Sequence, residues 1–243
     1  MAIDPAGVPR ARVSWRPSYR LIPSRYPTVI LYDAIADAAD LDAVFAIEAL
    51  ANPRLRDEAG ELQLVPREER VTGPGATPVM AAFTHLNPEG SRFSDGTYGV
   101  YYAAHSLATA VAEVSHHRAV FMRRTVEPAI DLDMRLVTAS VEAELHDLGS
   151  VPVEGSAPNR FAAALDPDDY GPPQRLGRAL RDTGSWGLRW PSVRDAGGEC
   201  VGIFRPKALR HAKAAAHIAL HWDGQRITHW FEKKQPQELG GGC

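Results

Sequence analysis

Residues 90–113 bring together the side chains with the clearest chemical potential in this sequence. Several glycines in this stretch let the backbone approach a ligand closely, and Arg92 can grip phosphate oxygens with its forked guanidinium group. Tyr101 and Tyr102 offer flat ring faces, and Glu113 supplies a carboxylate eleven residues after Tyr102. Such a set of residues suits a nucleotide that carries a pyrophosphate.

A short strand and the helix after it must position these residues. Residues 100–103 form an apolar run that follows a glycine, which is typical of a buried strand. Ser106 can then cap a helix, with apolar residues at helical spacing on one face: Leu107, Ala110, Val111 and Val114. Glu113 lies about 100° from the centre of that face. It therefore sits at the edge, where a carboxylate can face a cleft.

Further strands and helices alternate loosely along the chain. Strands are predicted at residues 19–22, 130–136 and 200–204, and as a hairpin at 218–231 around Asp223-Gly224. Helices are predicted at residues 41–48, after Asp40, and at 174–183. Residues 52–78 are rich in proline and charge, so we expect a loop-rich excursion outside the core. Gly73-Pro74-Gly75 lacks the spacing of Rossmann and P-loop motifs, which disfavours a doubly wound nucleotide fold.

Composition excludes several classes of protein. With 243 residues, 44% of them hydrophobic, the chain can bury the core of one domain. A net charge of -3 gives no bulk attraction to nucleic acid or to an anionic membrane. The two cysteines, Cys200 and Cys243, do not indicate a disulfide scaffold. No apolar segment has the length of a signal peptide or a membrane span, so we expect a cytoplasmic protein.

The order of these motifs resembles that of the RES domain, a family named for Arg, Glu and Ser positions and found as the toxin beside Xre-type antitoxins. The matching pieces are residues 19–22, 90–93, 100–106, 110–113, 169–177 and 191–200. Each piece is weak alone, but together they extend over most of the chain.

The resemblance implies an α+β fold, a single compact domain whose mixed sheet is like that of ADP-ribosyltransferases, with flanking helices. We place the domain at residues 18–234, with residues 1–17 as an N-terminal extension, 52–78 as the loop-rich excursion and 235–243 as a flexible tail. The resemblance further implies that NAD is a substrate, that no cofactor is tightly bound, and that a cognate Xre-type antitoxin is the protein partner. Direct binding of nucleic acid or membrane is not expected, and a homo-oligomer is left open.

Carried over residue by residue, the resemblance assigns Glu113, Arg20 and Tyr102 to catalysis and Arg92 to substrate binding. Arg25 competes with Arg20 for the role of the first arginine. Tyr101 is the alternative to Tyr102, because neighbouring strand residues point to opposite faces and only one can face the site.

The family serine falls by spacing at Gly171, which has no side chain, so Ser192 is the candidate replacement. His116 and His117 invite a metal interpretation, but their side chains point about 100° apart on a helix and no third ligand is evident, so no metal is expected.

The family's members either cleave NAD by hydrolysis or phosphorolysis, or transfer ADP-ribose to a protein. The residues do not decide among water, phosphate and a protein as acceptor. A catalytically silent module that binds a nucleotide or a partner is a third interpretation, and Gly171 is its best support.

Overall fold

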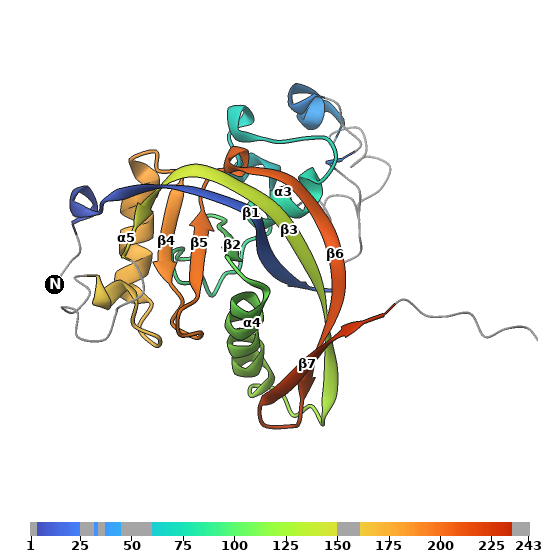
Figure 1. Ribbon diagram of the computed structural model, residues 1–243. Coiled ribbons are helices and arrows are strands. Elements are labelled where there is room, and N and C mark those ends of the chain that lie inside the picture. Colours follow the sequence, from blue (N-terminus) through green and yellow to red (C-terminus); the bar gives the residue numbers. More distant parts are fainter. Residues whose placement is uncertain (1–3, 25–31, 34–36, 45–59, 150–160, 235–243) are drawn as a thin grey trace, which may run out of the picture.

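The computed structural model describes residues 4–24, 32–33, 37–44, 60–149 and 161–234. These residues form one compact α+β domain built on a seven-stranded mixed sheet (Figure 1). The strands are β1 (Arg10–Pro23), β2 (Tyr101–Ala104), β3 (Ile130–Asp147), β4 (Gly187–Pro191), β5 (Glu199–Ile203), β6 (Leu209–Trp222) and β7 (Ile227–Lys233). The flanking helices are α3 (Ala76–Thr84), α4 (Leu107–Met122) and α5 (Gly171–Asp182).

The strand order is β1-β2-β5-β4-β3-β6-β7, and β1 also pairs with β3. The strands from β1 to β3 in this order therefore close into a ring. β3 pairs antiparallel with β1 and β6 over long stretches but meets β4 in parallel only at its last two residues. In Figure 1, β3 and β6 form a long arch, and α4 lies on its concave side.

The sheet separates two hydrophobic cores. α4 and α5 cover one face, where Val111, Leu176 and Leu180 pack in a common cluster with residues of β3 and β6. α3 covers the other face, where Val79 and Met80 pack with the other set of strand residues. The side of the sheet that a strand residue faces therefore decides which helices it can meet.

The structure confirms the predicted strand and helix around Glu113. Residues 101–104 form β2, and α4 begins directly after its N-cap Ser106, whose hydroxyl accepts a hydrogen bond from the backbone N–H of Thr109. The predicted strands at 19–22, 130–136 and 200–204 lie largely within β1, β3 and β5, and the predicted hairpin is β6 and β7. The helix expected over 174–183 corresponds to α5.

The predicted domain start at residue 18 is too late. β1 begins at Arg10, and Val13 and Trp15 are buried in the core under α3. This segment alternates buried and exposed residues, and it pairs along the second half of β3. Long pairing with β3 recruits residues 10–17 into the sheet despite their arginines and Pro17.

Part of the predicted 52–78 excursion belongs to the core. Val65 and Ala76 are buried, and α3 starts at Ala76. The carboxylate of Asp33 accepts hydrogen bonds from the backbone N–H groups of Gly75 and Thr77, which caps the start of this helix from a distant part of the chain. The glycine-proline run thus marks a helix start and not only a loop.

One strand was missed, and one predicted helix lies only partly within the described residues. β4 was not predicted, and of the helix expected at 41–48 only residues 41–44, which are helical, lie within the described residues. The predicted tail at 235–243 lies outside the described residues.

Candidate active site

The carboxylate of Glu113 is held by two side chains, one from the turn after β4 and one from β5. The hydroxyl of Ser192 donates a hydrogen bond of 2.6 Å to Glu113 Oε1, and the thiol of Cys200 lies 3.7 Å from the same oxygen. The Ser192 hydroxyl accepts from the backbone N–H groups of Arg194 and Asp195, which leaves its own proton for Glu113. Among the described residues, none donates to Glu113 Oε2, so this oxygen is available to a ligand.

Tyr102 ties the preceding loop to β2. Its hydroxyl accepts a hydrogen bond of 2.9 Å from the backbone N–H of Phe93 and lies 2.8 Å from the hydroxyl of Ser91. The Tyr102 ring packs edge-on against Trp190, with 6.1 Å between ring centroids. Burial raises the pKa of Tyr102 to about 12, so the phenol stays protonated. Tyr102 therefore fixes the loop that carries Arg92.

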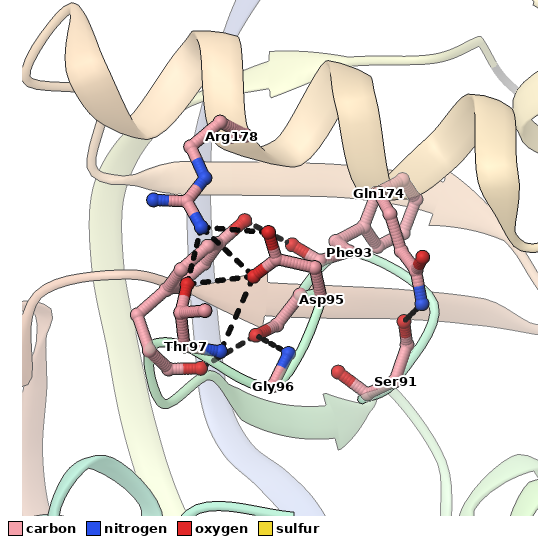
Figure 2. Close-up of polar contacts among 9 residues, drawn as sticks. Ser91, Phe93, Asp95, Gly96, Thr97, Gln174 and Arg178 are labelled. Carbon is pink, nitrogen blue, oxygen red and sulfur yellow. Dashed lines mark hydrogen bonds and ion pairs between the residues drawn. The ribbon is translucent and has the colours of Figure 1, made fainter. Parts of the chain in front are cut away.

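α5 anchors the same loop from the other side (Figure 2). The amide of Gln174 donates to the carbonyl of Ser91 at 3.1 Å, and the guanidinium of Arg178 contacts both carboxylate oxygens of Asp95 at 2.9 and 2.7 Å. Hydrogen bonds from Thr97 and then from Arg178 lower the pKa of Asp95 to about 2. The loop is thus held at both ends before any ligand arrives.

The loop needs glycine where it turns. Gly90 has a φ of +76°, and a Cβ there would lie 2.7 Å from the carbonyl oxygen of Ser94. On α5, a Cβ at Gly177 would lie 2.2 Å from the carbonyl oxygen of Phe93. These two glycines allow the loop and α5 to approach each other closely.

Arg92 is buried and holds the segment before α5. Its guanidinium donates to the carbonyl of Asp166 at 2.7 Å, approaches that of Ala164 at 3.5 Å, and stacks 4.7 Å from the ring centroid of Tyr170. Arg194, from the turn that carries Ser192, donates to the carbonyl of Pro167 at 2.6 Å. Arg92 and Arg194 thus bind neighbouring carbonyls of one segment, residues 164–167.

Positive charge gathers on the α4 face beyond Glu113. His117 lies one helical turn after Glu113. Desolvation and then the charges of Arg194 and Arg92 lower the pKa of His117 to about 4, so its imidazole is neutral at pH 7. Both guanidinium groups therefore disfavour a proton on His117.

Arg20 and Tyr101 lie on the other face of the sheet. Tyr101 belongs to the core under α3, whereas Tyr102 packs against the core under α4. The guanidinium of Arg20 stacks 4.6 Å from the Tyr101 ring centroid and donates to the carbonyl of Tyr102 at 3.0 Å. Arg20 Nε and the Tyr101 hydroxyl are buried without hydrogen-bond partners among the described residues. The structure therefore does not bring Arg20 beside Glu113.

Of the two positions considered for the family serine, only one contacts Glu113. Ser192 contacts Glu113, whereas Gly171 begins α5, where a Cβ would lie 3.2 Å from the carboxylate of Asp169. The side chain beside the glutamate is thus Ser192. Arg25 lies outside the described residues.

Sequence reasoning did not assign three residues of this site: Arg194, Tyr170 and Cys200. Arg194 could have been found as the cation two residues after Ser192, and Tyr170 as the aromatic directly before α5. Cys200 gave no signal of its own, because its position relative to Glu113 depends on how β5 pairs in the sheet.

A surface hollow of about 490 Å³ adjoins this region at the start of α4. It is lined by His105, Ser106, Thr109, Asp195, Ala196, Gly197, Gly198 and Glu199.

Among the described residues, no group of three His, Cys, Asp or Glu side chains could hold a metal ion. No helix in the described part of the chain is long and apolar enough to cross a membrane.

The fold and the held carboxylate define a single-domain α+β protein whose candidate site lies between α4, the loop before β2 and the β4–β5 turn. The RES domain family model matches residues 67–223, so the chain belongs to the RES domain family, as its motifs predicted. The matched range contains Arg92, Tyr102, Glu113 and Ser192, whereas Arg20 precedes it.

Two known proteins are similar to this chain over most of its length. The uncharacterized protein y4oC of Sinorhizobium fredii is 30% identical over 231 residues, which cover 92% of this chain and 93% of that protein. The crystal structure of the M. tuberculosis MbcT–MbcA toxin–antitoxin complex contains a chain that matches 85% of this one over 86% of its own length. The TM-score of that match is 0.44 and the identity 14%.

Proposed function

We propose that this chain is the toxin of a toxin–antitoxin pair and that it cleaves NAD at the bond between nicotinamide and ribose. Membership of the RES domain family supports the proposal, because the family's members act on NAD. The observation that carries it is the carboxylate of Glu113, held by Ser192 at 2.6 Å with Oε2 left available.

The proposed reaction depends more on a carboxylate fixed beside the ribose than on a general acid. Nicotinamide leaves as a neutral base when its bond to the ribose carbon breaks, and positive charge develops on the sugar as an oxocarbenium ion. Glu113 Oε2 would accept a hydrogen bond from the ribose 2′-hydroxyl and place negative charge beside that cation. An oxygen of water or phosphate then bonds to the same carbon, and water loses one proton in this step.

Arg92 and Arg194 would bind the pyrophosphate. Arg194 follows Ser192, which contacts Glu113, by two residues, and both arginines donate to carbonyls of residues 164–167, which are weaker partners than phosphate oxygens. Tyr170, already stacked on Arg92, and Tyr102 would supply ring faces beside the substrate. NAD is thus a substrate in this proposal, and no resident cofactor takes part.

The partner in this proposal is a cognate Xre-type antitoxin, and the compartment is the cytoplasm. Unchecked, the enzyme would deplete NAD and arrest growth. Hydrolysis and phosphorolysis share the site and differ only in the acceptor, as does transfer of ADP-ribose to a protein.

The test is incubation of the purified protein with NAD, with and without phosphate, while nicotinamide release and product mass are followed. Glu113→Gln should lower release by about 100-fold to 1,000-fold while the variant stays folded by circular dichroism. Arg92→Lys keeps the charge but loses the forked contact, and it should weaken NAD binding. Glu144→Gln, at an exposed carboxylate on β3, is the matched control and should behave as wild type.

Product mass names the acceptor, as ADP-ribose for water or its phosphorylated form for phosphate. Equal release by wild type and Glu113→Gln would contradict the assigned role of Glu113. No release by a folded wild-type protein under either condition would overturn NAD cleavage as its function.

A further inference from the structure

Cys200 is a buried thiol in direct contact with the carboxylate of the candidate site. It lies on β5, is 3% exposed, and pairs in register with Ala104 on β2 and Trp190 on β4. Its sulfur is 3.7 Å from Glu113 Oε1, the oxygen that also accepts the proton of Ser192. The motifs that predicted the site give this cysteine no role.

The thiol can only donate to Glu113 while it keeps its proton. Burial, and then the negative charge of Glu113, raise the pKa of Cys200 well above its usual range. A thiolate would in any case repel the carboxylate across 3.7 Å. The S–H group therefore persists at neutral pH and points its weak donor at a charged acceptor.

Two hydrogen-bond donors on one oxygen restrict the orientation of the Glu113 carboxylate more than a single donor does. With Ser192 alone, the Glu113 side chain could pivot about a single hydrogen bond. Cys200 reaches the same oxygen from within β5, whereas Ser192 lies in the turn after β4, so the two contacts come from different segments of the chain. Because two donors bind Oε1 from different directions, the position of Oε2 is fixed as well.

We propose that Cys200 is a positioning residue for Glu113: its S–H group and the Ser192 hydroxyl together occupy Oε1 and direct Oε2 to the substrate. The kinetic consequence rests on the proposed NAD cleavage, whereas the contact itself does not. Cys200 does not touch the substrate in this proposal, and its thiol undergoes no reaction.

Kinetics of matched variants test the consequence. Cys200→Val fills a similar volume without a donor, and it should lower kcat roughly threefold to tenfold with KM unchanged, as expected for loss of one weak hydrogen bond to a charged group. Cys200→Ser restores a donor and should recover at least half of the wild-type kcat. Val201→Ala, which removes packing on the opposite face of β5, should lower thermal stability but leave kcat unchanged.

A wild-type kcat in the Cys200→Val variant would overturn the proposal. So would equal losses in Cys200→Val and Cys200→Ser, because those would follow from packing alone.

Infrared spectroscopy tests the contact without any need for activity. In a Cys243→Ser background Cys200 is the single thiol, and its S–H stretching band should lie at the lower frequency of a hydrogen-bonded thiol. Glu113→Gln should shift the band toward the frequency of a free thiol, because a neutral amide is a weaker acceptor than a carboxylate. Glu144→Gln should leave the band in place.

A band that Glu113→Gln does not move would overturn the proposal even if NAD is cleaved. A band that moves in a protein without NAD turnover would sustain the contact and disprove the proposed function alone.

Discussion

The adjacent tyrosines of β2 point to opposite faces of the sheet, and their hydroxyl groups differ in hydrogen bonding. On the α4 face, the Tyr102 hydroxyl has two hydrogen-bond partners, and the nearby Glu113 and Ser192 are bonded to each other. On the α3 face, the Tyr101 hydroxyl and Arg20 Nε are buried without partners among the described residues. A buried polar group with no partner costs stability, so the α3 face keeps an arrangement that folding alone does not favour.

This contrast indicates which face has its polar side chains fixed in position for a ligand. The α4 face has its carboxylate, its loop and its two arginines fixed in position before a ligand arrives. The α3 face has a buried guanidinium stacked on a ring, with a single hydrogen bond to the Tyr102 carbonyl. The proposed catalysis relies on fixed electrostatics and would therefore use the α4 face, and variants on both faces test this assignment.

The largest effect should come from removing the charge on the α4 face. Glu113→Gln keeps the shape of the side chain and an oxygen for the Ser192 hydroxyl, but it loses the negative charge beside the developing cation. We expect NAD cleavage to fall by about 100-fold to 1,000-fold. Initial rates of nicotinamide release measure the loss. A reduction below tenfold would move the catalytic centre away from this face.

Phenylalanine variants of the two adjacent tyrosines should differ in stability. Tyr102→Phe leaves the Phe93 N–H and the Ser91 hydroxyl without their partner, so the free energy of unfolding should fall by about 1–3 kcal/mol. Tyr101→Phe removes a hydroxyl that has no partner, so stability should be unchanged or slightly higher. Urea denaturation gives both values, and equal losses in the two variants would refute the difference between the faces.

Arg20→Met separates a ligand-binding role from a structural one. The variant removes a buried cation and its bond to the Tyr102 carbonyl, two changes that oppose each other, so the free energy of unfolding should change by less than about 1 kcal/mol. Because Arg20 lies on the face opposite Glu113, KM for NAD should stay close to the wild-type value. A roughly tenfold rise in KM, equal to about 1.4 kcal/mol of binding, would place Arg20 at the substrate, as the family resemblance implies. A large stability loss with an unchanged KM would make Arg20 a structural residue.

The smallest expected effect is a change in how the free energy of unfolding depends on pH, and it comes from His146 on β3. Burial and the nearby charge of Arg10 lower the pKa of His146 below its ordinary value. Below a pH of about 6.5 the unfolded chain therefore binds more protons at this residue than the folded one, so stability is lost as the pH falls. His146→Asn should make the free energy of unfolding less dependent on pH between about 5 and 7. Identical slopes in both proteins would exclude this contribution.

Local patterns in the sequence identified the elements that need few distant contacts. α4 follows from the Ser106 cap and the helical spacing of its apolar residues, and the β6–β7 hairpin follows from the Asp223-Gly224 turn. The first half of β1 was missed because its arginines and Pro17 suggest a tail, and only pairing with β3 makes it a strand. α3 was missed because its cap, Asp33, lies more than forty residues away in the chain.

The sequence by itself determined the family, because residue types at short, fixed spacings carry the resemblance. The resemblance in turn implied the α+β class and Arg92, Tyr102 and Glu113 as candidate residues. The tertiary structure decided which side chains meet. The alternation of side chains in β2 placed Arg20 with Tyr101 and away from Glu113. The β4–β5 pairing brought Ser192 and Cys200 to the glutamate across about 80 residues, a distance that no local pattern spans.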